Sequence, residues 1–216
     1  MRKTESPDPQ TQALLKRLAA EGGSPVYELT PREARASRNP FFAALGGPPP
    51  SVSKVENRSI PGPSGKISVR IYTPEFGMND AAGYPLLVYF HGGGWLLGNL
   101  DTHDSFCRSF ANTSGCIVVS VDYRLAPENR FPAAVEDAYA AVCWVRENAR
   151  HFNGDASRMA VGGDSAGGNL ATVCCLMAKE RKGPGLAHQL LLYPVLDLSS
   201  FDKPSYQEHA SGYLLT

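Results

Sequence analysis

A serine stands inside a glycine motif at residues 163–167, which read Gly-Asp-Ser-Ala-Gly. The motif follows an apolar run at 159–161, predicted to be a strand, and opens an amphipathic helix predicted over 166–182. A strand, a tight turn and a helix in this order form the setting of a nucleophile elbow, in which a strained backbone presents the serine hydroxyl. The pattern alone arises by chance about 0.15 times in a chain of this composition. A glycine-rich turn with a capping serine therefore stays an alternative.

A second glycine motif, His-Gly-Gly-Gly-Trp, occupies residues 91–95 directly after the apolar run 86–90. Three successive glycines leave backbone N–H groups uncovered, so the oxyanion that develops in acyl transfer can approach them. A flexible loop or a phosphate-binding turn is the alternative, but the G-x-G-x-x-G spacing is absent and no lysine follows to complete a P-loop. His91 stands at the edge of this loop, where a structural hydrogen-bonding role is favoured over that of a catalytic base.

Three further motifs accompany the two glycine motifs. Residues 122–128 read Asp-Tyr-Arg-Leu-Ala-Pro-Glu, residues 131–134 read Phe-Pro-Ala-Ala, and residues 193–194 read Tyr-Pro. In their order along the chain, the five motifs resemble those of the hormone-sensitive-lipase-like group of α/β-hydrolase carboxylesterases. The resemblance covers most of the chain. It implies a three-layer α/β-hydrolase fold with a mostly parallel central sheet and an N-terminal helical cap.

The resemblance also implies a function and a set of site residues. The implied activity is carboxylic-ester hydrolysis of a small-molecule ester through an acyl intermediate on Ser165, with no metal and no organic cofactor. Residues 122–128 are implied to brace the site, and Phe41 and Phe42 of the cap to line the acyl pocket. The implied oxyanion hole and its support consist of the N–H groups of Gly93, Gly94 and Ala166 together with His91 and Gly92.

A serine nucleophile needs a base and an acid that orients the base, and in this fold both follow the serine along the chain. After Ser165 the histidines are His188 and His209. His188 stands at the start of a predicted strand, opposite the catalytic end, and the family pattern places no catalytic histidine at His209. Asp197, which follows the last predicted strand, is a candidate acid only in a variant arrangement. We therefore expect a chain without the last two strands and both triad partners, weak or inactive by itself.

Two explanations of the missing residues stay open. The chain is either a C-terminally truncated form of a longer esterase or a complete polypeptide without two triad members. Besides an enzyme, the sequence allows a module that binds a small molecule, as plant gibberellin receptors of this family do without the catalytic histidine, or a non-catalytic truncated isoform. The intact Ser165 and glycine loop favour the enzyme.

Strands and helices alternate after residue 51, which is typical of three layers around a mostly parallel sheet. The apolar runs at 86–90 and 116–121 predict strands that are buried on both faces. Alternation of apolar and polar residues at 67–72 predicts a strand with one solvated face. The other predicted elements are strands at 55–60, 159–161 and 190–193 and helices at 133–149 and 166–182.

The first part of the chain differs from the rest. We expect a helical cap segment and linker at 1–50 and the hydrolase core, incomplete at its C-terminus, at 51–216. A capping box formed by Thr30 and Glu33 predicts the start of a helix. This helix is expected to stop before the Asn-Pro pair at 39–40, because the residue before a proline disfavours helical geometry.

The 216 residues carry no net formal charge, and 43% of them are hydrophobic while 19% are charged. This composition excludes a mainly disordered chain, and the balanced charge argues against nucleic acid or an anionic membrane as the main partner. No run approaches the roughly 18 apolar residues of a membrane span, and the polar start argues against a secretory signal. With five cysteines expected to be reduced, these features predict a cytoplasmic protein. They do not indicate its oligomeric state.

Overall fold

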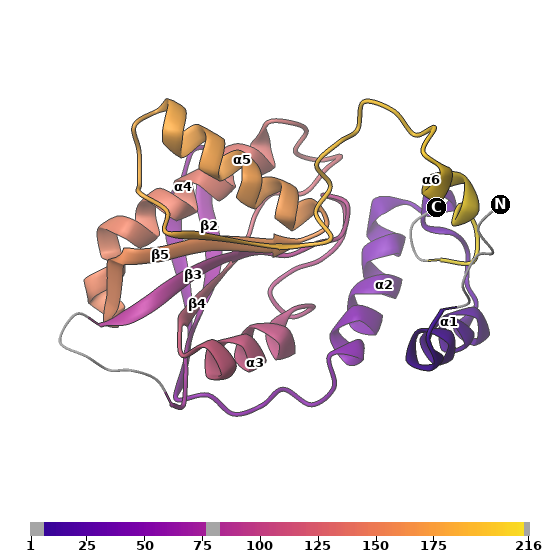
Figure 1. Ribbon diagram of the computed structural model, residues 1–216, viewed down its shortest axis with the longest axis horizontal. Coiled ribbons are helices and arrows are strands. Elements are labelled where there is room, and N and C mark those ends of the chain that lie inside the picture. Colours follow the sequence, from indigo (N-terminus) through magenta and orange to yellow (C-terminus); the bar gives the residue numbers. More distant parts are fainter. Residues whose placement is uncertain (1–6, 77–82, 214–216) are drawn as a thin grey trace. The chain divides into compact units, whose positions relative to one another are not determined.

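The structure, a computed structural model, describes residues 7–76 and 83–213. Its strands are β1 (Lys54–Gly62), β2 (Gly65–Thr73), β3 (Tyr84–Phe90), β4 (Ile117–Asp122), β5 (Gly154–Asp164) and β6 (His188–Leu192). They form one sheet with the order β1-β2-β4-β3-β5-β6 (Figure 1). The strands β4, β3, β5 and β6 run parallel, whereas β2 pairs antiparallel with both β1 and β4.

Helices cover both faces of this sheet. The helices α4 (Ala133–Asn148) and α5 (Ala166–Glu180) pack on one face, and α3 (Asp104–Ser114) packs on the other (Figure 1). The predicted three-layer α/β fold is therefore confirmed. Because the parallel strands all end at the same edge, the loops that follow β3 and β5 meet there.

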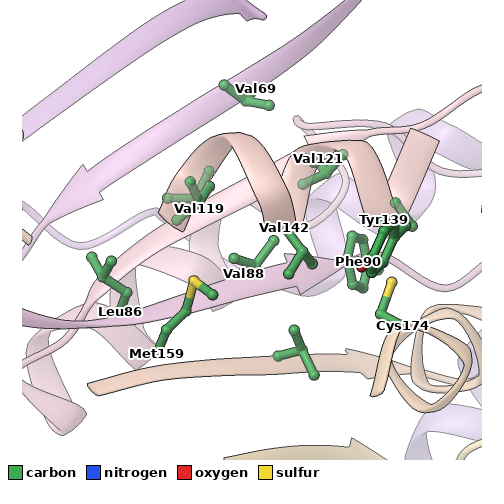
Figure 2. Close-up of a cluster of buried hydrophobic side chains, with 14 of the residues drawn as sticks. Val69, Leu86, Val88, Phe90, Val119, Val121, Tyr139, Val142, Met159 and Cys174 are labelled. Atoms are coloured by element: carbon green, nitrogen blue, oxygen red, sulfur yellow. The ribbon is translucent and has the colours of Figure 1, made fainter. Parts of the chain in front are cut away.

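The two central strands are buried on both faces, as their continuous apolar runs predict. On the face covered by α4 and α5, Leu86, Val88 and Phe90 of β3 lie beside Val119 and Val121 of β4 (Figure 2). Alternate residues of the same strands point to the opposite face, because successive side chains in a strand alternate. That smaller core consists of Tyr72, Leu87, Tyr89, Cys107, Ala111 and Val118.

The strand β2 only partly follows its predicted pattern. Ile67, Val69 and Ile71 are buried on one face, as the alternation predicts. Tyr72 is also fully buried, however, because it belongs to the core on the opposite face, and its hydroxyl donates a hydrogen bond of 2.8 Å to Asp104 at the start of α3. The solvated face of β2 is therefore shorter than predicted.

The helix α3 is absent from the predicted elements. Its buried residues Cys107 and Ala111 are four positions apart, with Phe106 and Phe110 packed beside them. This spacing is the signal that identifies a helix, but the serine, asparagine and threonine residues elsewhere in α3 obscure it. Gly115, at a φ of 68°, ends the helix in the left-handed region that glycine adopts without steric cost.

The N-terminal capping box is present, but the helix that it starts is longer than predicted. The helix α2 spans Pro31–Leu45, with both hydrogen bonds of the capping box formed. The predicted end before the Asn-Pro pair is wrong, because α2 continues through Pro40. A proline inside a helix removes one backbone hydrogen bond. Contacts with the rest of the fold compensate, since Ala34 is fully buried and Asn39 accepts a hydrogen bond from the backbone of Gly98.

The chain divides into two compact units. One unit is Thr30–Leu196 and contains the sheet, α2 to α5 and a 3₁₀ helix at Ala149–Phe152. The other unit combines the two ends of the chain, up to Leu29 and from Asp197. It contains α1 (Pro9–Glu21), a 3₁₀ helix (Val26–Glu28) and α6 (Pro204–Glu208). The predicted division into a cap at 1–50 and a core at 51–216 stays a prediction.

Two further properties concern the whole described chain. No helix within residues 7–76 and 83–213 is both long and apolar enough to cross a membrane. All five cysteines are free thiols, of which Cys107 and Cys174 are buried.

The central strand β3 generates a prediction about stability. Leu86→Ala, at a side chain only 1% exposed, is expected to lower the free energy of unfolding by about 2–5 kcal/mol, because apolar burial is lost and a cavity remains. The matched control is Leu176→Ala on α5, where the leucine is 62% exposed; it is expected to change stability by no more than about 0.5 kcal/mol. Urea unfolding followed by circular dichroism measures both, and equal effects would contradict the described core.

Candidate active site

Ser165 occupies the turn between β5 and α5. Its backbone has a φ of 51° and a ψ of −117°, a combination that is strained for any residue with a side chain. Ala166 begins the helix directly afterwards, so the partial positive charge of the helix N-terminus lies next to the serine. The strand, strained serine and helix have the geometry of a nucleophile elbow.

The glycines of the motif allow the elbow to lie against the end of β3. A Cβ atom at Gly167 would overlap the carbonyl oxygen of Phe90, and one at Gly163 would overlap the backbone of Gly167. Any larger residue would push β3 and the elbow apart. The spacing of the glycines around Ser165 thus follows from the close approach of two backbones.

Hydrogen bonds from the end of β6 hold the backbone of Ser165. Its N–H donates to the carbonyl of Leu192 at 2.9 Å, and its carbonyl accepts from the N–H of Val195 at 3.2 Å. Asn169 adds a second link, because its side-chain amide donates to the carbonyl of Val195 at 2.9 Å. The Ser165 side chain is only partly buried. Its hydroxyl has no hydrogen-bonding partner among the residues that the structure describes.

The loop after β3, residues 91–98 and called the glycine loop below, presents unpaired backbone donors. Gly93 and Gly94 have φ values of 121° and 61°, which glycine adopts readily. The N–H groups of Leu96 and Leu97 both donate to the carbonyl of Gly93, at 3.0 and 2.8 Å, which closes the loop into a turn. Within the described ranges, the N–H groups of Gly93, Gly94 and Ala166 donate to no protein acceptor. Three such donors, on the two segments that follow β3 and β5, are the type of group that stabilises an oxyanion.

The carboxylate of Asp164 joins this loop to the elbow. Its Oδ1 atom accepts hydrogen bonds from the hydroxyl of Tyr89 at 2.7 Å and from the N–H of Gly92 at 2.9 Å. His103 Nε2 lies 3.1 Å from the same oxygen. Burial by itself would raise the pKa of Asp164, but the hydrogen bonds from His103, Tyr89 and Gly92 outweigh it and hold the pKa below its ordinary value. Asp164 is therefore an ionised, buried anchor.

Sequence reasoning assigns no role to Asp164, Tyr89 or His103. Tyr89 and Asp164 are 75 positions apart, and Gly92 and Asp164 are 72 apart, so no local pattern links them. The one available signal is a charged residue at the end of a strand that is otherwise apolar, because a buried charge requires hydrogen-bonding partners.

His91 lies beneath the glycine loop. It is fully buried, and its ring stacks on that of Tyr123 with 4.4 Å between the centroids. Its Nδ1 atom is 2.9 Å from the carbonyl oxygen of Gly92. Because a carbonyl only accepts, the neutral ring carries its hydrogen on Nδ1. Burial lowers the pKa of His91 to about 4, so the ring is uncharged at neutral pH and supports the loop as a neutral donor.

The segment 122–128 contacts the loop at both of its ends. The hydroxyl of Tyr123 donates to the carbonyl of His91 at 2.7 Å, and the N–H of Ala126 donates to the carbonyl of Trp95 at 2.8 Å. Arg124 anchors the segment in turn, because its guanidinium binds both carboxylate oxygens of Asp137, each at 2.8 Å. These contacts are those of a bracing segment, as the family resemblance implies.

No histidine in the described chain hydrogen-bonds to Ser165. His188 is exposed at the first position of β6 and pairs in register with Ala160. It therefore lies four residues, or about 13 Å, from the register position of Asp164 beside the elbow. His103 uses both ring nitrogens, because Nδ1 lies 2.9 Å from the hydroxyl of Thr102 and Nε2 contacts Asp164.

The remaining predicted candidates make contacts of their own. Asp197 belongs to the smaller unit, where its carboxylate binds Lys203 at 2.7 Å and Ser199 at 2.6 Å, and His209 follows α6 in the same unit. The rings of Phe41 and Phe42 on α2 are 5.8 Å apart and partly exposed, and their lining role stays a prediction. Among the described residues, no group of three histidine, cysteine or acidic side chains is placed to hold a metal ion.

The burial of His91 generates a prediction about pH. Below pH 6.5 the unfolded chain takes up a proton at His91 that the folded chain takes up only near pH 4. Stability is therefore expected to fall between these two values, by on the order of 3 kcal/mol. In His91→Gln this part of the pH dependence is expected to be absent, whereas His188→Gln, at an exposed histidine, is expected to retain it. Unfolding free energies measured from pH 7 to pH 4 test this, and identical profiles for all three proteins would refute it.

Comparison with known proteins identifies the family of the chain. A family model described as the alpha/beta hydrolase fold matches residues 87–216. The carboxylic ester hydrolase LipN of Mycobacterium tuberculosis is 46% identical over 188 residues, which cover 85% of this chain and 48% of LipN. The chain thus spans about half the length of this curated relative.

Solved structures are similar over nearly the whole chain. An ester hydrolase from the metagenome of Lake Arreo matches with a TM-score of 0.89 and 42% identity, covering 96% of this chain and 66% of that one. A hyperthermophilic esterase from the archaeon Pyrobaculum calidifontis matches with a TM-score of 0.87 and 40% identity, covering 98% of this chain and 67% of that one. The chain therefore belongs to the family of alpha/beta hydrolase fold proteins, as its resemblance to the hormone-sensitive-lipase-like carboxylesterases predicts.

Proposed function

We propose that this chain provides the nucleophile and the oxyanion-binding groups of a carboxylic-ester hydrolase. The observation that carries the proposal is the strained Ser165 at the start of α5, beside a glycine loop whose N–H groups are unpaired within the described residues. The similarity to LipN, a carboxylic ester hydrolase, supports the same reaction class. The substrate is a small-molecule ester.

In the proposed reaction, Ser165 Oγ attacks the carbonyl carbon of the ester. The carbonyl oxygen then becomes an oxyanion, which accepts hydrogen bonds from the N–H groups of Gly93, Gly94 and Ala166. The hydroxyl proton of Ser165 passes to solvent water. When the tetrahedral intermediate collapses, the bond to the alcohol oxygen breaks, that oxygen takes up a proton from water, and the acyl group remains on Ser165. Water then attacks the acyl carbon, which releases the acid and restores the serine.

His91 and Gly92 support these donors in the proposal. The N–H of Gly92 is fixed on Asp164, and the His91 ring donates to the carbonyl of Gly92. Donors that are already oriented need no reorganisation when the charge develops, which is the basis of their contribution to the rate. Neither residue reacts with the substrate.

The described residues do not place a base on the Ser165 hydroxyl. Acylation by this chain is therefore expected to be slow, because an oxyanion hole and binding without a complete triad leave only a rate roughly 10³–10⁴ above that in water. Such a rate still permits a covalent product to accumulate on the serine. The cytoplasmic location inferred from the sequence stays a prediction.

The proposal predicts one acylated residue. After incubation with p-nitrophenyl acetate, intact-mass spectrometry is expected to show an acetyl adduct that peptide mapping places on Ser165. Ser165→Ala is expected to lose the adduct, and Ser53→Ala, at an exposed serine in a loop, is expected to keep it. An adduct of equal yield in Ser165→Ala would contradict the proposal.

A binding module is the second candidate. The observation that favours it is the absence of a histidine on the Ser165 hydroxyl in the described chain. Saturable binding of a small ester by the wild-type chain, with no acyl adduct and no alcohol release after prolonged incubation, would favour the binding module over the enzyme.

A further inference from the structure

The side chain of Arg35 on α2 reaches the glycine loop and the bracing segment at the same time. Its Nε donates to the carbonyl of Leu96 at 2.8 Å, and its Nη2 donates to the carbonyl of Ala126 at 2.8 Å. Its two terminal nitrogens also bind the two oxygens of Glu128, at 2.8 and 2.7 Å. One guanidinium thus connects three segments that are far apart in the sequence.

The residues whose carbonyls Arg35 holds are hydrogen-bonded in turn to the backbone of the glycine loop. Leu96, whose carbonyl accepts from Arg35, donates its own N–H to the carbonyl of Gly93. Ala126, whose carbonyl also accepts from Arg35, donates its N–H to the carbonyl of Trp95. Through these links Arg35 restrains the peptide group that joins Gly93 to Gly94 and the one that joins Trp95 to Leu96.

A second residue on the same face of α2 holds the end of the loop. Asn39, one helical turn after Arg35, accepts a hydrogen bond of 3.0 Å from the N–H of Gly98. Gly98 lies so close to His91 that a Cβ atom there would overlap the imidazole ring. The helix α2 thus supports the loop from outside, while Asp164 and His91 support it from inside.

The geometry distinguishes the roles of the partners of Arg35. Glu128 is 53% exposed whereas Arg35 is 25% exposed, so the ion pair is screened by water and contributes little by itself. The hydrogen bonds from Arg35 to the two carbonyls are partly buried. Water screens them less than it screens the ion pair, so they contribute more to the restraint on the loop. Only the planar fork of arginine can reach two carbonyls and a carboxylate together, which a lysine ammonium cannot do.

We propose that Arg35 is a positioning residue that couples α2 to the oxyanion-binding loop and fixes the orientation of the Gly94 N–H group. The restraint on the loop is a property of the fold and does not depend on the proposed function. Its effect on acylation rests on the proposed function. Arg35 acts through the backbone of the loop and takes no part in the reaction itself.

The restraint is tested without any substrate by hydrogen exchange followed by NMR. In Arg35→Ala and Arg35→Lys, the hydrogen-bonded amides of Leu96 and Leu97 are expected to exchange about tenfold faster than in the wild type, because the loss of a hydrogen bond from a charged group loosens the turn that they close. The exchange rates of the amides of β3 are expected to be unchanged. Arg32→Lys, at an exposed arginine on the same helix, is the matched control and is expected to behave like the wild type.

Two further comparisons separate the carbonyl bonds from the ion pair and guard against a variant that does not fold. Glu128→Gln leaves both carbonyl bonds in place and is expected to change the exchange rates by less than about twofold. If Arg35→Ala does not fold, Arg35→Lys decides the question alone, since it retains the charge and the alkyl chain. If the Leu96 and Leu97 amides exchange in Arg35→Lys at the same rate as in the wild type and Arg32→Lys, the proposal is overturned.

The consequence for acylation is measured as the release of p-nitrophenol in a single turnover. In Arg35→Lys the maximal rate is expected to fall by about tenfold, less than the roughly 10²–10³ for complete removal of an oxyanion donor, while the half-saturating ester concentration stays unchanged. A raised half-saturating concentration with an unchanged maximal rate would overturn the positioning role. If the wild-type chain forms no acyl product, the proposed function fails, and the exchange measurement still decides the role of Arg35.

Discussion

The rest of the site depends on the hydrogen bonds that the Asp164 carboxylate accepts. A single oxygen of this residue accepts hydrogen bonds from the hydroxyl of Tyr89 on β3 and from the N–H of Gly92 in the glycine loop. Nε2 of His103, at the start of α3, contacts the same oxygen. Asp164 is also the residue immediately before Ser165. The nucleophile and the oxyanion-binding loop are therefore connected through one buried charge, which is stable only because these donors satisfy it.

The strain at Ser165 is tolerated for a related reason. A non-glycine residue with a positive φ costs on the order of 1–3 kcal/mol and persists only where its surroundings determine it fully. Here the hydrogen bonds to Leu192 and Val195 fix the peptide groups on both sides of the residue. The close contacts of Gly163 and Gly167 with the end of β3 leave the turn no room to relax.

The chain thus holds its loop from two directions. Inside the fold, Asp164 and the neutral ring of His91 fix its first residues. Outside, Arg35 and Asn39 of α2 fix its last residues. The N–H groups in between stay free of protein acceptors within the described ranges, which is the condition under which they can receive a developing negative charge.

Sequence patterns predict the parts of this arrangement that depend on local periodicity. The strands β3 and β4 and the helices α4 and α5 follow from apolar spacing, and Ser165 follows from a glycine motif between a strand and a helix. The extension of α2 through Pro40 is not predictable in this way, because contacts distant in sequence compensate for the lost hydrogen bond. The link from Asp164 to Tyr89 is equally invisible, since it joins residues that meet only in the folded chain.

The central claim is that Asp164 fixes the glycine loop on the elbow, and hydrogen exchange at the Gly92 amide in Asp164→Asn tests it most directly. The variant keeps the size of the side chain but replaces a charged acceptor of several hydrogen bonds by a neutral amide oxygen. In this variant the Gly92 amide is expected to exchange at least about tenfold faster than in the wild type, because a hydrogen bond to an ionised acceptor is weakened, while the amides of β4 keep their wild-type rates. An unchanged rate at Gly92 in a folded variant would contradict it.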